Sequence, residues 1–216
     1  MSDIKAYKPS TNSLGAGQVF QCPYTYEKAR VVVREMADAL ALDLVDKCLV
    51  TDQLVLTVGY DIENLADGER RKNYHGEIKR DRYGRDIPKH AHGTENLDVQ
   101  TSSSAMLVDA VTRLYDRIVD EGMLIRRVNL SANRVIDESQ AEKKTEFEQM
   151  DLFTDYRALE QEKEEEKAAR ERERRIQEAM LDIKKKYGKN AILKGLSYQE
   201  GATGKERNRQ IGGHKA

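Results

Sequence analysis

An alternation of apolar and polar side chains from Gln53 to Tyr60 most constrains the fold of this chain. Every second residue from Leu54 to Val58 is Leu or Val, and these side chains fall on one side of an extended backbone. Val55 and Thr57 fall on the other side. The segment therefore predicts a half-buried β-strand that is long enough to lie centrally in a sheet.

A second alternating segment runs from about Leu124 to Ile136 and predicts a strand with one apolar and one polar side. Two shorter extended pieces complete a set of four strands: Leu14 to Phe20, expected to end before Cys22-Pro23, and about His92 to Val99. On the last strand, the side chains expected to point inward are Val128, Leu130 and Ala132, and those expected to point outward are Arg127, Asn129, Ser131 and Asn133.

Two other stretches carry apolar residues at the three-to-four-residue spacing of an α-helix. The first begins near Tyr24, with Thr25 as its expected N-cap. The second follows Thr101-Ser102-Ser103-Ser104, which offers several N-cap candidates, and is expected to end at Gly122. The expected core faces are Ala29, Val32, Val33, Met36, Leu40 and Leu44 in the first helix, and Leu107, Val111, Leu114 and Ile118 in the second.

The resulting order, β-α-β-β-α-β, predicts an α+β domain in which two helices cross a four-stranded antiparallel sheet. Because each helix has one apolar face, both are expected on the same side of the sheet. The opposite side is then open, and on the last strand it is polar and basic. We expect this domain to span residues 14–138, after a polar linker over residues 1–13.

Three further segments follow the domain. Residues 139–156 are charged and predict a flexible tether. Residues 157–187 are dominated by Glu, Lys, Arg and Ala, with opposite charges three or four apart, and predict a long exposed helix. Residues 188–216 are Gly-rich, with six Lys or Arg against two Glu, and predict a flexible basic tail. The charged helix has an apolar stripe that could dock only at its end, at Ile176, Met180, Ile183 and Tyr187.

The amino-acid composition indicates a chain made of several structural parts rather than one hydrophobic core. Of the 216 residues 38% are hydrophobic and 35% are charged, which is too polar for the whole length to share one core. Cys22 and Cys48 lack the spacing of a zinc site or a disulfide framework, which suits a reducing cytoplasm. No apolar run approaches membrane-spanning length, and the first residues do not form a signal peptide. We therefore expect a cytoplasmic protein with no membrane partner.

The long polar connection from Asp61 to about His90 concentrates positive charge. Between Arg70 and His92 there are eight Lys or Arg residues against three acidic residues. Such a stretch can be a solvated loop without a partner. Beside a polar sheet face it instead favours contacts with the phosphate backbone of DNA or RNA. Because Tyr74 and Tyr83 are its only aromatic residues, the sequence favours backbone contacts with a duplex over base stacking on a single strand.

A pentapeptide within the predicted tether has the composition of a docking peptide: Gln149, Met150, Asp151, Leu152 and Phe153. It combines an amide side chain with two adjacent bulky apolar residues, and charged sequence lies on both sides. We expect Leu152 and Phe153 to enter a pocket of another protein, with Gln149 hydrogen-bonded at its rim. The alternative is the apolar stripe of an ordinary helix, because Tyr156 and Leu159 continue the helical spacing.

The chain shows no self-contained catalytic or metal site. His90 and His92 stand two apart without an obvious third ligand, so a structural or phosphate-contacting role is favoured over metal binding. Gly204-Lys205 resembles the end of a phosphate-binding loop, but Glu206 stands where Ser or Thr must hold magnesium. No Ser-His-Asp or Cys-His set is indicated by spacing. We therefore expect no catalytic residue and no cofactor in this chain.

Taken together, these parts resemble the C-terminal portion of a Y-family translesion DNA polymerase. The most similar group is the catalytic subunit of bacterial DNA polymerase V and its relatives, the ImpB/MucB/SamB group. The resemblance covers nearly the whole chain in order. It rests on Ser13-Leu14-Gly15-Ala16-Gly17-Gln18, Lys28-Ala29-Arg30, Val58-Gly59-Tyr60-Asp61, Pro88-Lys89-His90-Ala91-His92-Gly93-Thr94, Thr101-Ser102-Ser103, the pentapeptide, Lys186-Tyr187-Gly188-Lys189-Asn190 and Ile211-Gly212-Gly213-His214-Lys215-Ala216.

The resemblance implies that the β-α-β-β-α-β domain is the little finger, which grips primer-template DNA through its sheet. It also implies that residues 149–153 dock on the bacterial sliding clamp, with Met150 in place of a commoner Leu. The resemblance and the basic, polar pattern together give the expected DNA contacts: Arg80, Arg82, Arg85, Lys89, His90, His92, Thr101, Ser102, Arg127, Asn129 and Asn133.

The chain departs from the family in one large respect, because nothing in it stands in for the catalytic palm and its magnesium-binding carboxylates. We therefore expect a split or truncated product, inactive alone, that serves SOS repair of damaged DNA and has an N-terminal polymerase fragment as a further partner. Two alternatives remain open at this point. One is a stand-alone adaptor or competitor on the clamp, and the other is an RNA-binding α+β domain.

Overall fold

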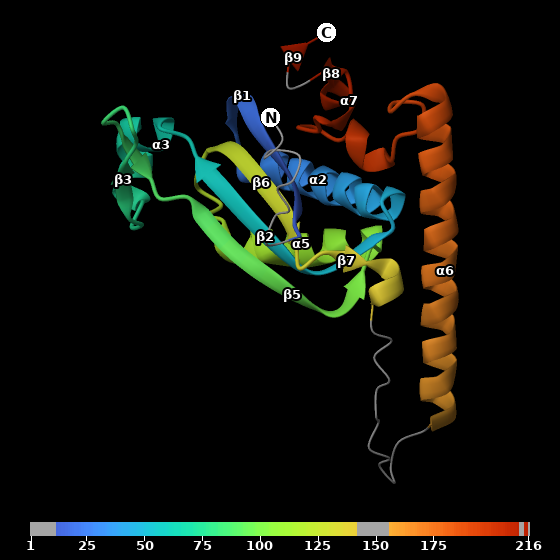
Figure 1. The fold of residues 1–216 in the computed structure, drawn as a ribbon. Helices are drawn as coiled ribbons and strands as arrows, with labels where there is room; N and C mark the ends of the chain where they lie inside the picture. Colours follow the sequence, from blue (N-terminus) through green and yellow to red (C-terminus); the bar gives the residue numbers. More distant parts are fainter. Residues whose placement is uncertain (1–11, 142–155, 212–213, 216) are drawn as a thin grey trace, which may run out of the picture.

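The computed structural model describes residues 12–141, 156–211 and 214–215 (Figure 1). Its main sheet is antiparallel and has the order β1-β6-β2-β5, with the short strand β7 paired to the start of β2. The strands of the main sheet are β1 (Leu14–Tyr24), β2 (Leu49–Tyr60), β5 (Ala91–Thr101), β6 (Ile125–Asn133) and β7 (Ile136–Asp137). The predicted α+β class, the order β-α-β-β-α-β and the central place of β2 are confirmed.

Two helices, α2 (Tyr26–Asp46) and α5 (Ser104–Ile118), lie on one face of this sheet (Figure 1). Thr25 is the N-cap position of α2, as predicted, although its side chain makes no capping hydrogen bond. Ser103 caps α5, and its hydroxyl accepts a hydrogen bond from the Met106 N–H. The helix ends at Ile118, before the predicted stop at Gly122.

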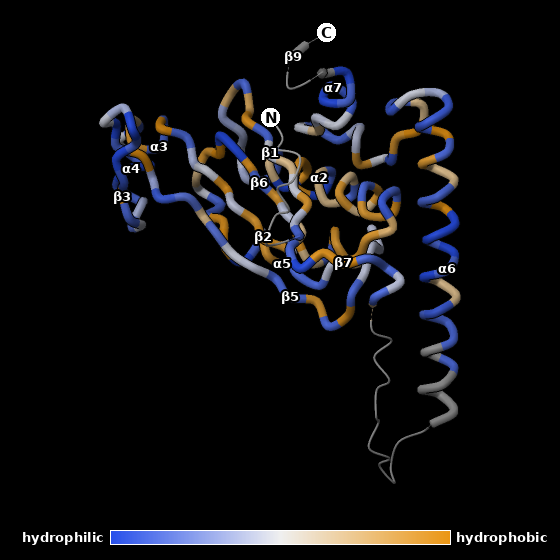
Figure 2. The backbone as a smooth tube through the Cα atoms, viewed as in Figure 1, coloured by the Kyte–Doolittle hydropathy of each residue, from blue (hydrophilic) through white to orange (hydrophobic). Residues whose placement is uncertain are grey.

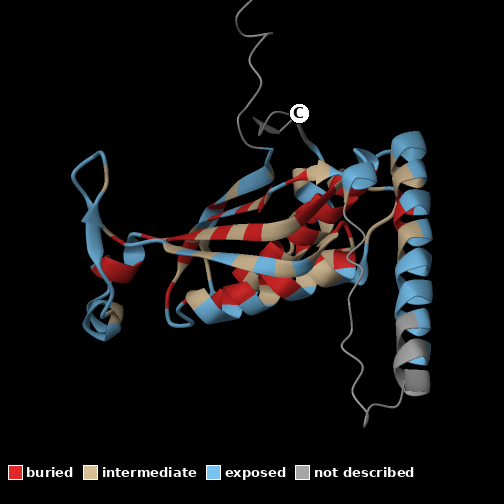
Figure 3. Cartoon of the chain, turned by 60° about the horizontal axis from the view of Figure 1, so that its bottom comes forward, coloured by how far each residue is buried: buried red, intermediate tan, exposed pale blue. Residues whose placement is uncertain are grey.

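The core lies between the sheet and these two helices, where buried positions concentrate (Figure 3). The alternating residues Leu54, Leu56 and Val58 are each 0% exposed, so the predicted inward face of the central strand is confirmed. Tyr115 is also fully buried, and its hydroxyl donates to the backbone oxygen of Tyr26. Figure 2 shows the same division, with apolar backbone positions between the layers and hydrophilic positions along most of α6.

The first strand extends beyond the predicted end at Phe20, because it continues through Cys22-Pro23 to Tyr24. Its pairing with β6 shifts between Val19 and Tyr24, so Pro23 lies within an irregular stretch of the ladder. Because β1 is at the edge of the sheet, a residue without an N–H costs no ladder hydrogen bond there. The strand near His92 is likewise longer than predicted.

The last predicted strand is two strands in the structure. At Arg134, φ is 50°, and this left-handed residue separates β6 from β7. The break turns the chain so that Ile136 and Asp137 pair with the first residues of β2. The inward positions Val128, Leu130 and Ala132 are buried as predicted.

The connection after β2 is folded, which the sequence prediction of a long polar connection missed. It contains α3 (Glu63–Ala66), α4 (Gly68–Asn73) and a hairpin of β3 (Ile78–Arg80) with β4 (Asp86–Pro88). Asn64 is fully buried, and its side chain hydrogen-bonds the backbone oxygen and N–H of Leu124. These long-range hydrogen bonds fasten the connection to the residue just before β6.

The long helix α6 (Tyr156–Tyr187) exists as predicted but is not exposed along its whole length. Met180 and Gln177 are buried, and the Gln177 amide donates to the Ser102 backbone oxygen and the Ser104 hydroxyl. The predicted apolar stripe is therefore only part of the contact. Polar side chains on the neighbouring face of the helix make much of it.

The predicted flexible tail is ordered over residues 188–211 and 214–215, which corrects the prediction from composition. It forms η2 (Gly195–Tyr198), α7 (Gly204–Arg207) and a small pairing of β8 (Gln210–Ile211) with β9 (His214–Lys215). Glu35 on α2 accepts hydrogen bonds from the backbone N–H groups of Thr203 (2.7 Å) and Gly204 (3.0 Å). Gly201, with φ of 90°, allows a turn rather than disorder.

Among the helices in the described part of the chain, none combines the length and the hydrophobicity that a membrane span requires.

Candidate nucleic-acid interface

The sheet surface away from α2 and α5 is called here the open face (Figures 1 and 3). Strand pairing brings Thr57 of β2 opposite both Asn129 of β6 and His92 of β5. The next pairs along the strands join Val55 to Ser131 and to Thr94. The open face is formed by residues Gly15, Gly17, Val19, Gln53, Val55, Thr57, Gly59, His92, Thr94, Asn96, Arg127, Asn129, Ser131 and Asn133.

Two glycines on the open face leave room for the polar side chains of β6. A Cβ atom on Gly59 would lie 2.5 Å from both Cγ and Nε of Arg127, so the Arg127 side chain lies across the backbone of Gly59. In the same way, a Cβ on Gly17 would lie 2.2 Å from Oδ1 of Asn129. A shallow depression forms there, with Thr57 and Ser131 among its lining residues. The missing Cβ atoms thus leave space in which the Arg127 and Asn129 side chains lie against the sheet backbone.

Positive and titratable side chains meet at the end of the open face where β5 begins. The Nδ1 atom of His92 is 2.9 Å from the hydroxyl of Thr57, and the ring centroids of His92 and His90 are 6.4 Å apart. Burial lowers the pKa of His90, and the nearby charges of Lys79 and Arg127 lower it further. Arg127 is exposed and forms no ion pair with the residues that the structure describes. Its guanidinium is available for an anion.

The β3–β4 hairpin extends the same end of the sheet, but its cations differ in availability. Arg80 pairs with Asp86 at 3.4 Å, and Lys89 pairs with Glu77 at 2.7 Å. Arg85 pairs with Asp81 at 2.7 Å, while Arg82 donates to the Tyr83 hydroxyl at 3.2 Å. The Arg80 and Lys89 pairs are exposed on both sides and therefore weak, so a phosphate can replace their carboxylate partners at small cost.

Thr101 and Ser102 lie elsewhere and are covered, unlike the other predicted DNA contacts. They are only 9% and 7% exposed, at the opposite end of β5 from His92. The Ser102 hydroxyl accepts from Arg174 of α6 at 3.1 Å. The Thr101 hydroxyl accepts from the Ser103 N–H at 3.0 Å. Both side chains are therefore enclosed in protein, and Ser102 is covered by Arg174 and Gln177 of α6.

Asn133 is half-buried at the same distant end of the open face. Its neighbours there are tied to one another, since Arg134 bonds both Asp52 (2.9 Å) and the Asn96 side chain (2.5 Å). The predicted contacts thus divide into an accessible group, formed by Arg127, Asn129, His90, His92 and the hairpin, and a distant group. The alternation of Gln53–Tyr60 placed Thr57 on the side of the strand opposite the core, but the predicted DNA contacts included neither Thr57 nor Gly59.

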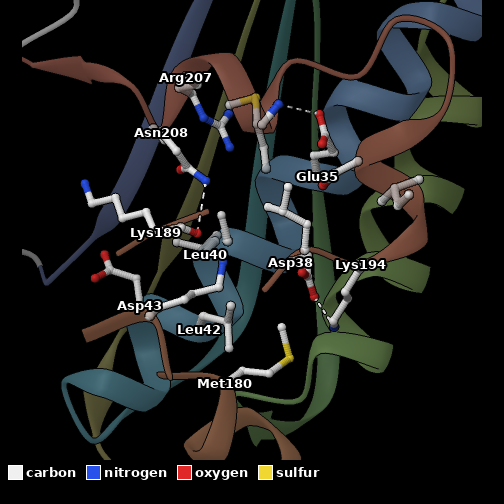
Figure 4. A pocket seen from close by; sticks show the side chains of 18 of the residues that line it. Glu35, Asp38, Leu40, Leu42, Asp43, Met180, Lys189, Lys194, Arg207 and Asn208 are labelled. Atoms are coloured by element: carbon white, nitrogen blue, oxygen red, sulfur yellow. Dashed lines mark hydrogen bonds and ion pairs between the residues drawn. The ribbon is translucent and has the colours of Figure 1, made fainter. Parts of the chain in front are cut away.

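A pocket of about 370 Å³ lies beside α2, between that helix, α6 and the tail (Figure 4). Charged side chains in this pocket join the tail to α2, since Asp38 of α2 forms an ion pair with Lys194 at 2.5 Å. The second carboxylate oxygen of Glu35, Oε1, has no hydrogen-bond partner among the described residues, but it is sealed from solvent beside Gly204.

In the described part of the chain, no three His, Cys, Asp or Glu side chains are grouped so that they could hold a metal ion. The pentapeptide at residues 149–153 lies outside the described residues.

Comparison with known proteins identifies the domain. The sequence profile described as the impB/mucB/samB family C-terminal domain matches residues 11–152. No curated protein matches the chain. A solved structure titled as a complex of the β-clamp processivity factor and the little finger domain of PolIV matches with 10% identity and a TM-score of 0.36. That match covers 56% of this chain and 86% of the other.

The family profile covers the four main strands, both core helices and the hairpin, and it extends to the pentapeptide. The chain therefore belongs to the impB/mucB/samB family, and residues 11–152 carry the C-terminal domain of that family.

Proposed function

We propose that this chain binds the backbone of primer-template DNA across its open face and docks on the bacterial sliding clamp through residues 149–153. The observation that carries the first part is the exposed guanidinium of Arg127, whose side chain lies across Gly59 beside His90 and His92. It stands where the basic hairpin meets a sheet face of small and polar side chains. Family membership gives this surface its context in translesion synthesis.

The arrangement suits phosphate contacts more than base-edge recognition. Arg127 and the hairpin cations supply positive charge, while Asn129 and Thr57 supply single hydrogen bonds. Small residues such as Gly17 let a sugar-phosphate backbone approach the sheet closely. Contacts of this kind position a duplex without reading its sequence, as an enzyme that copies varied templates requires.

DNA binding is tested with the full chain and a labelled primer-template in fluorescence anisotropy. We expect an affinity that falls steeply with salt, because phosphate contacts release counterions. Arg127→Ala should weaken binding by roughly tenfold, since it removes a charged hydrogen-bond donor. Arg172→Ala, an exposed arginine on α6, is the matched control and should bind as wild type. An affinity insensitive to salt and to Arg127→Ala would refute the proposal, and a preference for an RNA duplex would favour an RNA-binding domain.

Clamp docking is tested separately by surface plasmon resonance on an immobilised sliding clamp. The double variant Leu152→Ala/Phe153→Ala should abolish binding, because buried apolar anchors carry most of the affinity in such peptides. Asp151 lies between Gln149 and the two apolar anchors and is not itself an anchor, so Asp151→Ala should retain most of the affinity for the clamp. Equal binding by the double variant and wild type would exclude this peptide as the docking element.

A further inference from the structure

The turn of the β3–β4 hairpin is held in one conformation by the carboxylate of Asp81. One oxygen of Asp81 accepts from the backbone N–H groups of Tyr83 (2.8 Å) and Arg85 (3.0 Å). The other oxygen accepts from Nε of Arg85 at 2.8 Å. Gly84, with φ of 79°, completes the turn in a conformation that disfavours other residues. The hairpin tip is therefore ordered before any partner binds.

This turn presents an aromatic ring to solvent. The Tyr83 side chain is 70% exposed, although the guanidinium carbons of Arg82 and Arg85 lie 5.1 and 5.3 Å from its ring centroid. These cation–π contacts limit the rotamers of the ring. The entropic cost of fixing the ring on a partner is accordingly reduced, which is the property of an aromatic binding anchor.

The tip continues the positive end of the open face. The hairpin joins the end of β2 to the start of β5, where Arg127 and His92 lie. The charges of Lys79 on β3 and Arg127 on β6 both lower the pKa of His90, so the base of the hairpin and the end of the sheet lie in the same positive electrostatic potential. Figure 1 shows the hairpin standing beyond the end of the sheet that is far from α6. Nucleic acid bound on the open face can thus continue past the sheet to the tip.

We propose that Tyr83 stacks on an unpaired nucleobase of the template strand, while Arg82 contacts the adjacent phosphate. The inference rests on the proposed DNA binding and adds a second kind of contact to it. An exposed ring close to two guanidiniums suits a base with its phosphate, because stacking and charge are satisfied together. The predominance of cations around the ring favours nucleic acid over a protein partner. Stacking uses the face of a base, so this contact tolerates any template sequence.

The test compares two labelled probes with the full chain: a primer-template with a single-stranded overhang and a blunt duplex of equal length. Tyr83→Ala should weaken binding to the overhang probe by about tenfold and leave blunt-duplex binding within about twofold. Tyr83→Phe keeps the ring and should bind as wild type. Tyr198→Ala is the matched control, because Tyr198 is also 70% exposed but lies on η2 of the tail. A 2-aminopurine in the overhang should change its fluorescence with wild type and not with Tyr83→Ala.

Equal binding of the overhang probe by wild type and Tyr83→Ala overturns the inference, while salt-dependent binding that requires Arg127 would leave the proposed function standing. An equal loss of affinity for both probes also overturns the inference, because Tyr83 would then contribute to duplex binding alone. If wild type binds neither probe, the proposed function fails, and the stacking inference fails with it.

Discussion

Glu173 on α6 accepts a 2.5 Å hydrogen bond from the hydroxyl of Ser103, the N-cap of α5, although the two residues are 70 positions apart in sequence. Its other oxygen accepts from the Ala105 N–H at 2.9 Å. A carboxylate at the start of a helix satisfies free N–H groups and interacts favourably with the helix dipole. This pair therefore fastens α6 over the segment that contains Ser102.

Replacing Glu173 should loosen α6. Glu173→Ala removes two hydrogen bonds to a charged group, so we expect the free energy of unfolding to fall by about 1–3 kcal/mol in urea denaturation. Amide exchange in residues 164–180 should also become faster. Glu165→Ala, at an exposed position of the same helix, should change neither quantity. Unchanged exchange in Glu173→Ala would show that the contact does not hold the helix.

The tail should respond to a single methyl group at Gly204. A Cβ there would lie 2.6 Å from the buried Oε1 of Glu35, so Gly204→Ala must displace the carboxylate that binds Thr203 and Gly204. We expect faster proteolysis of residues 195–209 and a lower melting temperature. Gly195→Ala meets no atom within 4 Å and is the matched control. A Gly204→Ala tail as resistant as the control would contradict the role given to Glu35.

The position of Arg127 should depend on Gly59. The Gly59→Ala methyl would take the space of the Arg127 side chain, which would turn away from the sheet surface. We expect DNA affinity to fall by roughly three- to tenfold with little change in melting temperature, because Arg127 is exposed and can move. Gly68→Ala, at a position with open space around it, should bind as wild type. If Gly59→Ala and Gly68→Ala bind DNA with equal affinity, DNA binding does not depend on the position of the Arg127 side chain across Gly59.

DNA binding should strengthen as the pH falls through the titration of His90. In the free chain, burial and the charges of Lys79 and Arg127 lower the pKa of His90 below its usual 6.5. A bound phosphate favours the imidazolium, so it raises this pKa, and binding takes up a proton. Between pH 7.5 and 5.5, anisotropy should show rising affinity for wild type and a flatter profile for His90→Ala. Parallel profiles would exclude His90 from the interface.

The stability of the core should fall in acid through Asp116. Hydrogen bonds from Arg30, and then from Tyr26, lower the pKa of the Asp116 carboxyl below its usual 3.8. Its contribution is therefore present above that value and is lost as the pH falls through the folded-state pKa. Asp116→Asn should destabilise the protein at pH 7 and match wild type near pH 2. Asp109→Asn, whose carboxylate pairs with Arg113 on the exposed side of α5, should have little effect at either pH.

The layers of the domain and the identity of its core could be predicted from the amino-acid sequence. Residues such as Leu54 and Val128 follow a period of two, and Val32 and Leu107 follow helical spacing, so local pattern decides which side of each element is buried. The same alternation predicted that Arg127 and Asn129 would point away from the helices. These features can be predicted from the sequence because each depends on the spacing of residues within one helix or strand.

The accessibility of the polar residues, in contrast, depends on how the elements pack in three dimensions. Ser102 is enclosed because Arg174 and Gln177, more than 70 positions later, pack against it. The tail is ordered because Glu35, buried on α2, accepts hydrogen bonds from its backbone. A charged side chain that binds a distant partner has the same local sequence pattern as one that faces water. Its state is set by packing between elements, which composition and spacing do not specify.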